Sequence, residues 1–123
     1  MKQKIPYESY EQTQIFRWSR ANQIDYPELQ LLNASLAGFK LTPGQSRKAK
    51  AQGMRKGYPD IFLPVTTNQY AGLFIELKRI KGGSVSREQK AFLKRLNEQQ
   101  YLAVVCRGHR EAIDVVKKYL KIA

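Results

Sequence analysis

The spacing of apolar residues along the chain predicts a regular alternation of helices and strands. Apolar residues recur at helical spacing near the start, with Ile15, Phe16 and Trp18 among polar neighbours, whereas other stretches are short and almost continuously apolar. Helices are expected over residues 7–19, 43–52, from 86 onward and over 111–120, and strands over 27–33, 60–65, 71–79 and 101–106. This order predicts one α/β domain over residues 1–123, with a mixed sheet between helices.

Residues with special turn chemistry mark the ends of these elements. Thr42-Pro43 places proline at the first position of a helix, and Gly53 follows its end. Ser86 and Gln89 have the spacing of a capping box at the start of the next helix. Residues 66–70 have a length suited to a hairpin between two strands.

Three charged residues stand on the two strands that this hairpin joins. Glu76 and Lys78 point to the same face because side chains alternate along a strand, and the hairpin would bring Asp60 beside them. Charges in an apolar sheet need a partner or a metal ion, so the group predicts a divalent cation site. The alternative is that Asp60 only begins a strand, while Glu76 and Lys78 form an exposed ion pair.

A longer motif contains these residues, namely Gly53-x-x-x-Gly57-x-Pro59-Asp60 followed by Glu76-x-Lys78. It resembles the signature of the PD-(D/E)xK nucleases, and most of the chain is similar to the virus-type replication-repair nuclease (VRR-NUC) domain. The resemblance implies a restriction-endonuclease-like core, in which a mixed β-sheet is flanked by helices. It also implies Asp60, Glu76 and the backbone carbonyl of Leu77 as metal ligands, with Lys78 orienting the attacking water.

The resemblance extends to two helices. Glu11, on the first helix, would complete the metal site directly or through water, although Glu8 could serve instead. Gln89 would bind a phosphate or the attacking water, or would only satisfy the helix cap. Related RecB-like nucleases carry a tyrosine four residues after this glutamine, where this chain has Leu93.

The charge of the chain indicates a polyanionic partner. Its 123 residues include 22 Lys and Arg against 10 Asp and Glu, a formal charge of +12. There is no long apolar run or signal-peptide pattern, so we expect a soluble, cytoplasmic protein that binds DNA, in the host cytoplasm if phage-encoded. A basic stretch leads toward Asp60 and is the expected phosphate contact: Arg47, Lys48, Lys50, Arg55 and Lys56.

The single cysteine and single histidine limit other chemistry. Cys106 ends an apolar run and is expected to be buried and inert, and His109 is expected to be exposed beside the turn 107–110. They cannot form a His/Cys zinc cluster. A metal would therefore be held by oxygen, which suits Mg²⁺ or Mn²⁺.

Three functions agree with these features. The resemblance implies a metal-dependent endonuclease that cuts branched DNA such as four-way junctions. The alternatives are a non-catalytic basic nucleic-acid-binding protein and a sequence-specific restriction-type nuclease. A junction is two-fold symmetric and the chain has one site, so we expect a homodimer, with Tyr7, Tyr10 and Phe39 as candidates for its interface.

Overall fold

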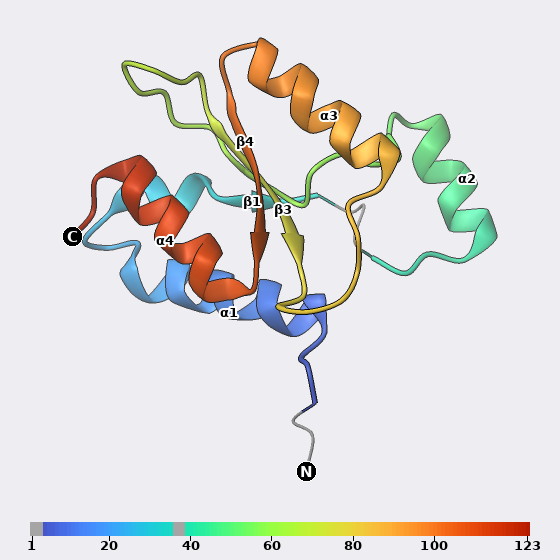
Figure 1. Cartoon of the computed structure of the whole chain (residues 1–123), viewed down its shortest axis with the longest axis horizontal. Coiled ribbons are helices and arrows are strands. Elements are labelled where there is room, and N and C mark those ends of the chain that lie inside the picture. Colours follow the sequence, from blue (N-terminus) through green and yellow to red (C-terminus); the bar gives the residue numbers. More distant parts are fainter. Residues whose placement is uncertain (1–3, 36–38) are drawn as a thin grey trace.

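The computed structural model describes residues 4–35 and 39–123. Four α-helices, one 3-10 helix and four strands follow one another in the described chain (Figure 1). The helices are α1 (Glu8–Asn22), η1 (Pro27–Leu31), α2 (Pro43–Ala51), α3 (Arg87–Glu98) and α4 (His109–Leu120). The strands are β1 (Asn33–Ala34), β2 (Ile61–Leu63), β3 (Leu73–Lys78) and β4 (Leu102–Arg107).

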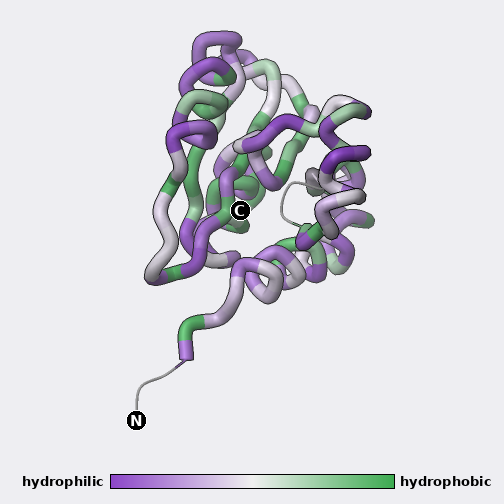
Figure 2. Tube along the Cα trace, turned by 90° about the vertical axis from the view of Figure 1, so that its right-hand side faces the viewer, coloured by the Kyte–Doolittle hydropathy of each residue, from purple (hydrophilic) through white to green (hydrophobic). Residues whose placement is uncertain are grey.

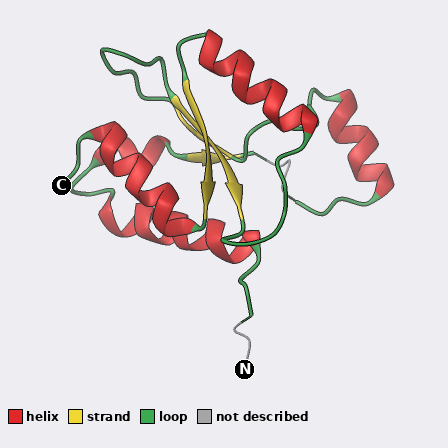
Figure 3. Cartoon of the chain, viewed as in Figure 1, coloured by secondary structure: helices red, strands yellow, loops and turns green. Residues whose placement is uncertain are grey.

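The strands form one mixed sheet in the order β1-β2-β3-β4. β2 pairs antiparallel with both β1 and β3, whereas β3 and β4 run parallel, joined through α3. The carboxyl ends of β3 and β4 therefore lie side by side, close to the first half of α1 (Figures 1 and 3). The predicted fold class, a mixed sheet flanked by helices, is confirmed.

Helices cover the two faces of this sheet unequally. Ile75 and Leu77 pack with Ile15 of α1 and Val116 of α4 in the main buried core. The opposite face carries an aromatic cluster in which Phe74 stacks on Phe62 at 4.2 Å between ring centroids, beside Tyr58, Phe92 and Tyr101. Hydrophilic and hydrophobic residues are interleaved along the helices, as expected where only one side is buried (Figure 2).

Both α2 and α3 begin with a capping box, of which the sequence predicted the one at Ser86 and Gln89. Thr42 and Gln45 cap α2, and Ser86 and Gln89 cap α3 through reciprocal side-chain to backbone bonds. Gly53 follows α2 with φ of 111°, a left-handed conformation that favours glycine. Among the described residues, no helix has the length and apolar character needed to cross a membrane.

The prediction of a strand over 27–33 was wrong for most of its length. Residues 27–31 form η1, with Pro27 at its start, and only Asn33–Ala34 pairs as a strand. Leu29 and Leu32 are buried while Leu31 is 51% exposed. The three-residue spacing of the two buried leucines is that of a 3-10 turn, not of a strand.

Candidate active site

Asp60 lies immediately before β2 and contacts the end of β3. Its Oδ2 accepts a hydrogen bond from the Leu77 N–H at 2.8 Å. Ile61 pairs with Ile75, so two residues further along this register would set Pro59 opposite Leu77. Proline has no N–H to donate to the Leu77 carbonyl, and the Leu77 N–H donates to the Asp60 carboxylate. The Pro59-Asp60 sequence thus ends the ladder pairing of β2 with β3 and leaves this edge of β3 open at the candidate site.

The Leu77 carbonyl points toward the same opening. The carbonyls of Gly72 and Lys78 accept bonds from β4 residues and the residue after β4, at 2.9 Å each. Because successive carbonyls alternate between the two sides of a strand, that of Leu77 points toward the β2 side, where Asp60 lies. The structure therefore directs the Asp60 carboxylate and the Leu77 carbonyl to the same edge of β3.

Glu76 and Lys78 lie on the α3 face of β3 and are deeply buried, with exposed fractions of 1% and 7%. Nζ of Lys78 donates to Oε1 of Gln89 at 3.0 Å. The same Oε1 accepts the Ser86 N–H at 2.8 Å, so Gln89 completes the helix cap and holds the lysine at once. Gln89 thus forms the helix cap that the sequence suggests, and its bond to Lys78 is a contact that the sequence did not indicate.

The loop before Asp60 packs directly on the start of α3. A Cβ at Gly57 would lie 2.7 Å from Glu88 backbone and side-chain carbons, and its φ is 86°. Only glycine fits this approach without a shift of the backbone. The close packing brings the Asp60 loop and the Gln89 turn together, which explains the glycine of the motif.

The Glu76 carboxyl is held in an unusual electrostatic environment. Burial, followed by a hydrogen bond to Asp60 and the Asp60 charge, raises the pKa of Glu76 to about 9, while the Lys78 charge opposes this rise. Oε2 of Glu76 is buried and has no hydrogen-bond partner among residues 4–35 and 39–123. A buried acid with an unpartnered oxygen beside a second carboxylate is the donor set that a hard cation would satisfy.

This pKa predicts how Glu76→Gln changes stability. Between the ordinary value of 4.5 and about 9, the folded protein holds a proton that the unfolded chain has lost, so folding weakens as pH rises. With a chelator present, the melting temperature of the wild type should fall between pH 5 and pH 9. The fall should exceed that of Glu76→Gln by at least about 5 °C. Thermal melts of both proteins across this range test it; parallel curves would show that Glu76 ionises normally.

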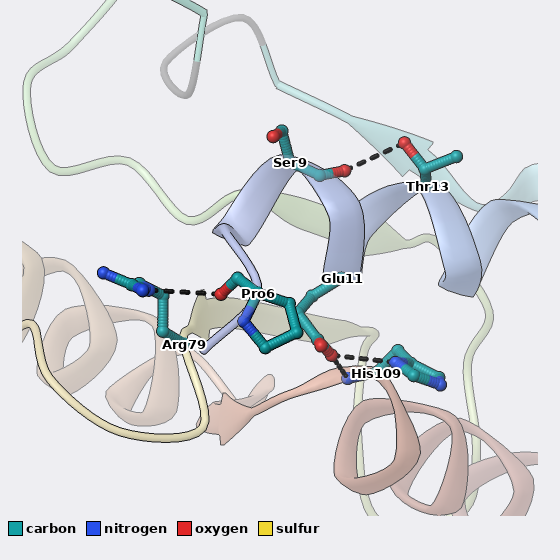
Figure 4. Close-up of polar contacts among 6 residues, drawn as sticks. All are labelled: Pro6, Ser9, Glu11, Thr13, Arg79 and His109. Carbon is teal, nitrogen blue, oxygen red and sulfur yellow. Dashed lines mark hydrogen bonds and ion pairs between the residues drawn. The ribbon is translucent and has the colours of Figure 1, made fainter. Parts of the chain in front are cut away.

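Glu11 faces a different group. Its Oε2 accepts a hydrogen bond from the backbone N–H of His109 at 2.5 Å and contacts the ring Nδ1 at 2.8 Å (Figure 4). The exposed fraction of Glu11 is 1%, and the contact lies at the start of α4, where a carboxylate is favoured. The prediction that His109 is merely exposed was wrong. The two residues are 98 positions apart, and no sequence pattern indicated their contact.

The two candidate carboxylates of α1 thus lie apart. Glu8 is exposed and lines an open cavity together with Asp60 and Leu77, whereas Glu11 is occupied by His109. In the part of the chain that the structure describes, no three Asp, Glu, His or Cys side chains gather as a metal-binding group. Glu11 is therefore not assembled with Asp60 and Glu76, and the site consists of two carboxylates and a carbonyl.

The basic stretch lies away from the core, on and after α2. This helix has no buried residue and stands beside the sheet (Figure 1). All five predicted phosphate-binding residues are exposed: Arg47, Lys48, Lys50, Arg55 and Lys56.

Cys106 is fully buried. Burial raises the pKa of its thiol to about 12, in agreement with an inert role.

The mixed sheet, with Asp60 and Glu76-x-Lys78 at its opened edge, is an arrangement of the PD-(D/E)xK nuclease class. The VRR-NUC domain family matches residues 4–110, and the chain belongs to this family. A solved structure described as a VRR_NUC domain protein superposes with a TM-score of 0.82 at 28% identity, covering 98% of this chain and 93% of that one. A search of curated proteins found no match.

Proposed function

We propose that the protein is a metal-dependent endonuclease that hydrolyses phosphodiester bonds in branched DNA. Membership of the VRR-NUC family makes it a nuclease. The observation that supports the metal dependence is that Asp60 accepts the Leu77 N–H and contacts Glu76, whose Oε2 has no hydrogen-bond partner in the described part of the chain. Lys78, held by Gln89, stands on the same strand.

The donor set fits Mg²⁺ or Mn²⁺. These ions accept oxygen ligands and commonly bind through one or two carboxylates, the other positions being taken by water and substrate phosphate. Asp60, Glu76 and the Leu77 carbonyl would hold the ion, which would neutralise charge on the phosphoryl oxygens. Glu11 would support the site indirectly. It accepts the His109 N–H at the start of α4, and the preceding Gly108 N–H donates to the Lys78 carbonyl.

Lys78 would orient the attacking water. Its ammonium has three donors, of which one is directed to Gln89, so others remain for the water and for the developing negative charge. Gln89 keeps the long lysine side chain in one rotamer, which lowers the entropic cost of reaching the reactive geometry. Gln89 is thus a positioning residue in this proposal, since it acts through Lys78.

Cleavage of supercoiled plasmid and of synthetic four-way junctions, in Mg²⁺ or in EDTA, tests the proposal. We expect cutting of junctions in preference to linear duplex, in Mg²⁺ alone. Binding without cutting would support the non-catalytic alternative, and cutting at a fixed sequence in linear duplex would support the restriction-type alternative. The proposed cleavage would take place in the cytoplasm, and in the host cytoplasm if the protein is phage-encoded.

The basic stretch would contact the DNA backbone. Replacing Arg47, Lys48 and Lys50 with alanine should weaken DNA binding and lower the slope of log affinity against log salt by about 1 for each phosphate that is no longer neutralised. The matched control removes three charges from the C-terminal end of α4, at Lys117, Lys118 and Lys121. Binding curves at several salt concentrations test this. Equal slopes in the two triple variants would place the DNA elsewhere.

Two copies would act on one junction. A single site per chain and two-fold symmetric DNA favour a two-fold dimer. Tyr7 and Tyr10 are exposed by 59% and 50%, and Phe39 by 61%, so these rings are available to a self-complementary patch. Sedimentation equilibrium should show twice the chain mass of 14.2 kDa. A monomer both free and bound to a junction would contradict the dimer.

A further inference from the structure

An open cavity of about 950 Å³ lies next to the candidate site. Part of its wall is a stripe of α1 at helical spacing, Glu8, Gln12, Phe16 and Arg20, and residues of η1 and β1 supply another part. Neither the proposed metal ligation nor the basic stretch uses most of this surface. Its volume is in the range of pockets that hold a small organic group.

The lining of the cavity combines apolar and amide groups. Phe16, Leu29 and Leu32 supply apolar surface, and the two leucines belong to the core. Gln12, Gln30 and Asn33 supply amide side chains, which can both donate and accept hydrogen bonds. A planar ring with donors and acceptors along its edge matches this lining, as a nucleobase does.

The cavity is continuous with the place where the scissile phosphate would lie. Asp60 and Leu77, two of the residues that would hold the metal, are among the residues that line it. Arg20 and Lys40 also line it and bring positive charge to the cavity. A DNA strand whose phosphate met Asp60 could therefore direct its adjacent base into the cavity and a neighbouring phosphate toward a cation.

We propose that this cavity receives one unpaired nucleobase adjacent to the cleaved phosphate. A base in a duplex has its hydrogen-bonding edge occupied and its faces stacked, so it could enter only after unpairing, which costs free energy. Bases at branch points or mismatches enter at lower cost. The cavity would thus favour DNA that is locally unpaired at the cut. This inference rests on the proposed endonuclease function, whose site it extends.

Cleavage of paired and locally unpaired DNA tests the proposal. After the cut position is mapped, a mismatch is placed at the nucleotide on each side of it in turn. Wild type should cut one mismatched substrate about tenfold faster, by kcat/KM, than the paired one. Gln12→Ala should lose this preference, whereas Gln14→Ala, on the same helix but outside the cavity lining, should keep it. Equal preference in the two variants would overturn the proposal.

A binding readout separates this inference from the proposed activity. A single-stranded oligonucleotide carrying 2-aminopurine is titrated with Lys78→Ala protein, with and without Gln12→Ala or Gln30→Ala. A fluorescence change that both cavity variants abolish supports the base site even if wild type cuts nothing. Cleavage with no mismatch preference and no cavity-dependent fluorescence leaves the endonuclease standing and overturns the base site. Absence of all DNA binding would overturn both.

Discussion

Replacement of Lys78 by alanine is expected to lower the rate of DNA cleavage by about 10²–10³-fold, because a donor to the developing charge is removed. DNA binding should change little, since one ammonium among 22 basic residues is a small part of the phosphate affinity. The lysine is 7% exposed, so its unique contribution is to the site and not to the surface field. Single-turnover cleavage and equilibrium binding of the same junction measure the two effects.

The controls for this variant follow from the structure. Lys94→Ala removes an exposed lysine from α3 and should leave the cleavage rate nearly unchanged. Lys78→Met keeps most of the buried volume and should be as inactive as alanine, which excludes a packing defect as the cause. Gln89 retains its bond to the Ser86 N–H in both variants, so the α3 cap should persist. Cleavage near the wild-type rate would remove Lys78 from the mechanism.

The sequence predicted most of the fold because its helices and strands have consistent local signals. The apolar run of β3 and the capping box before α3 each combine pattern with turn chemistry, and both elements form close to the expected bounds. η1 lacked such agreement. Its leucines fit either a short strand or a turn, and the burial of Leu29 and Leu32 by the rest of the fold decided between them.

The site was predictable where neighbours in sequence determine the geometry. Alternation along one strand places Glu76 and Lys78 on the same face, and the hairpin brings in Asp60 from nearby. Contacts between distant elements had no such signal. The contact of Glu11 with His109 depends on how α1 meets the start of α4, and the Lys78 to Gln89 bond depends on the placement of α3.

The cavity beside α1 was also not predictable from the sequence. Gln12 and Phe16 lie on a stripe of α1 next to the stripe that carries Glu11 and Ile15, and the sequence alone marks both stripes as ordinary polar and apolar positions. Glu8 and Glu11 are three residues apart, yet one lines the cavity and the other is buried against α4. The stripe with Gln12 and Phe16 becomes part of a concave surface because η1 and β1 pack beside α1.

Asp60→Asn is expected to weaken Mn²⁺ binding by more than about 100-fold, since removal of a direct ligand should exceed the 10–100-fold typical of outer partners. Cleavage should fall in parallel, because the phosphoryl charge would no longer be neutralised. Asparagine keeps an oxygen that can accept the Leu77 N–H, so the end of β3 should remain in place. Calorimetric titration of the folded variant with Mn²⁺ measures the change in affinity.

Two further variants make this result specific to the site. Asp114→Asn removes an exposed carboxylate of α4 and should bind Mn²⁺ as wild type does. Glu76→Gln should also bind Mn²⁺ more weakly. The bound ion would need a negatively charged carboxylate at this buried position, and glutamine cannot supply that charge. If both Asp60→Asn and Glu76→Gln bound Mn²⁺ normally, neither carboxylate would be a ligand. The role of the opened β3 edge would then be to shape DNA contacts, with the catalytic cation held by other oxygens.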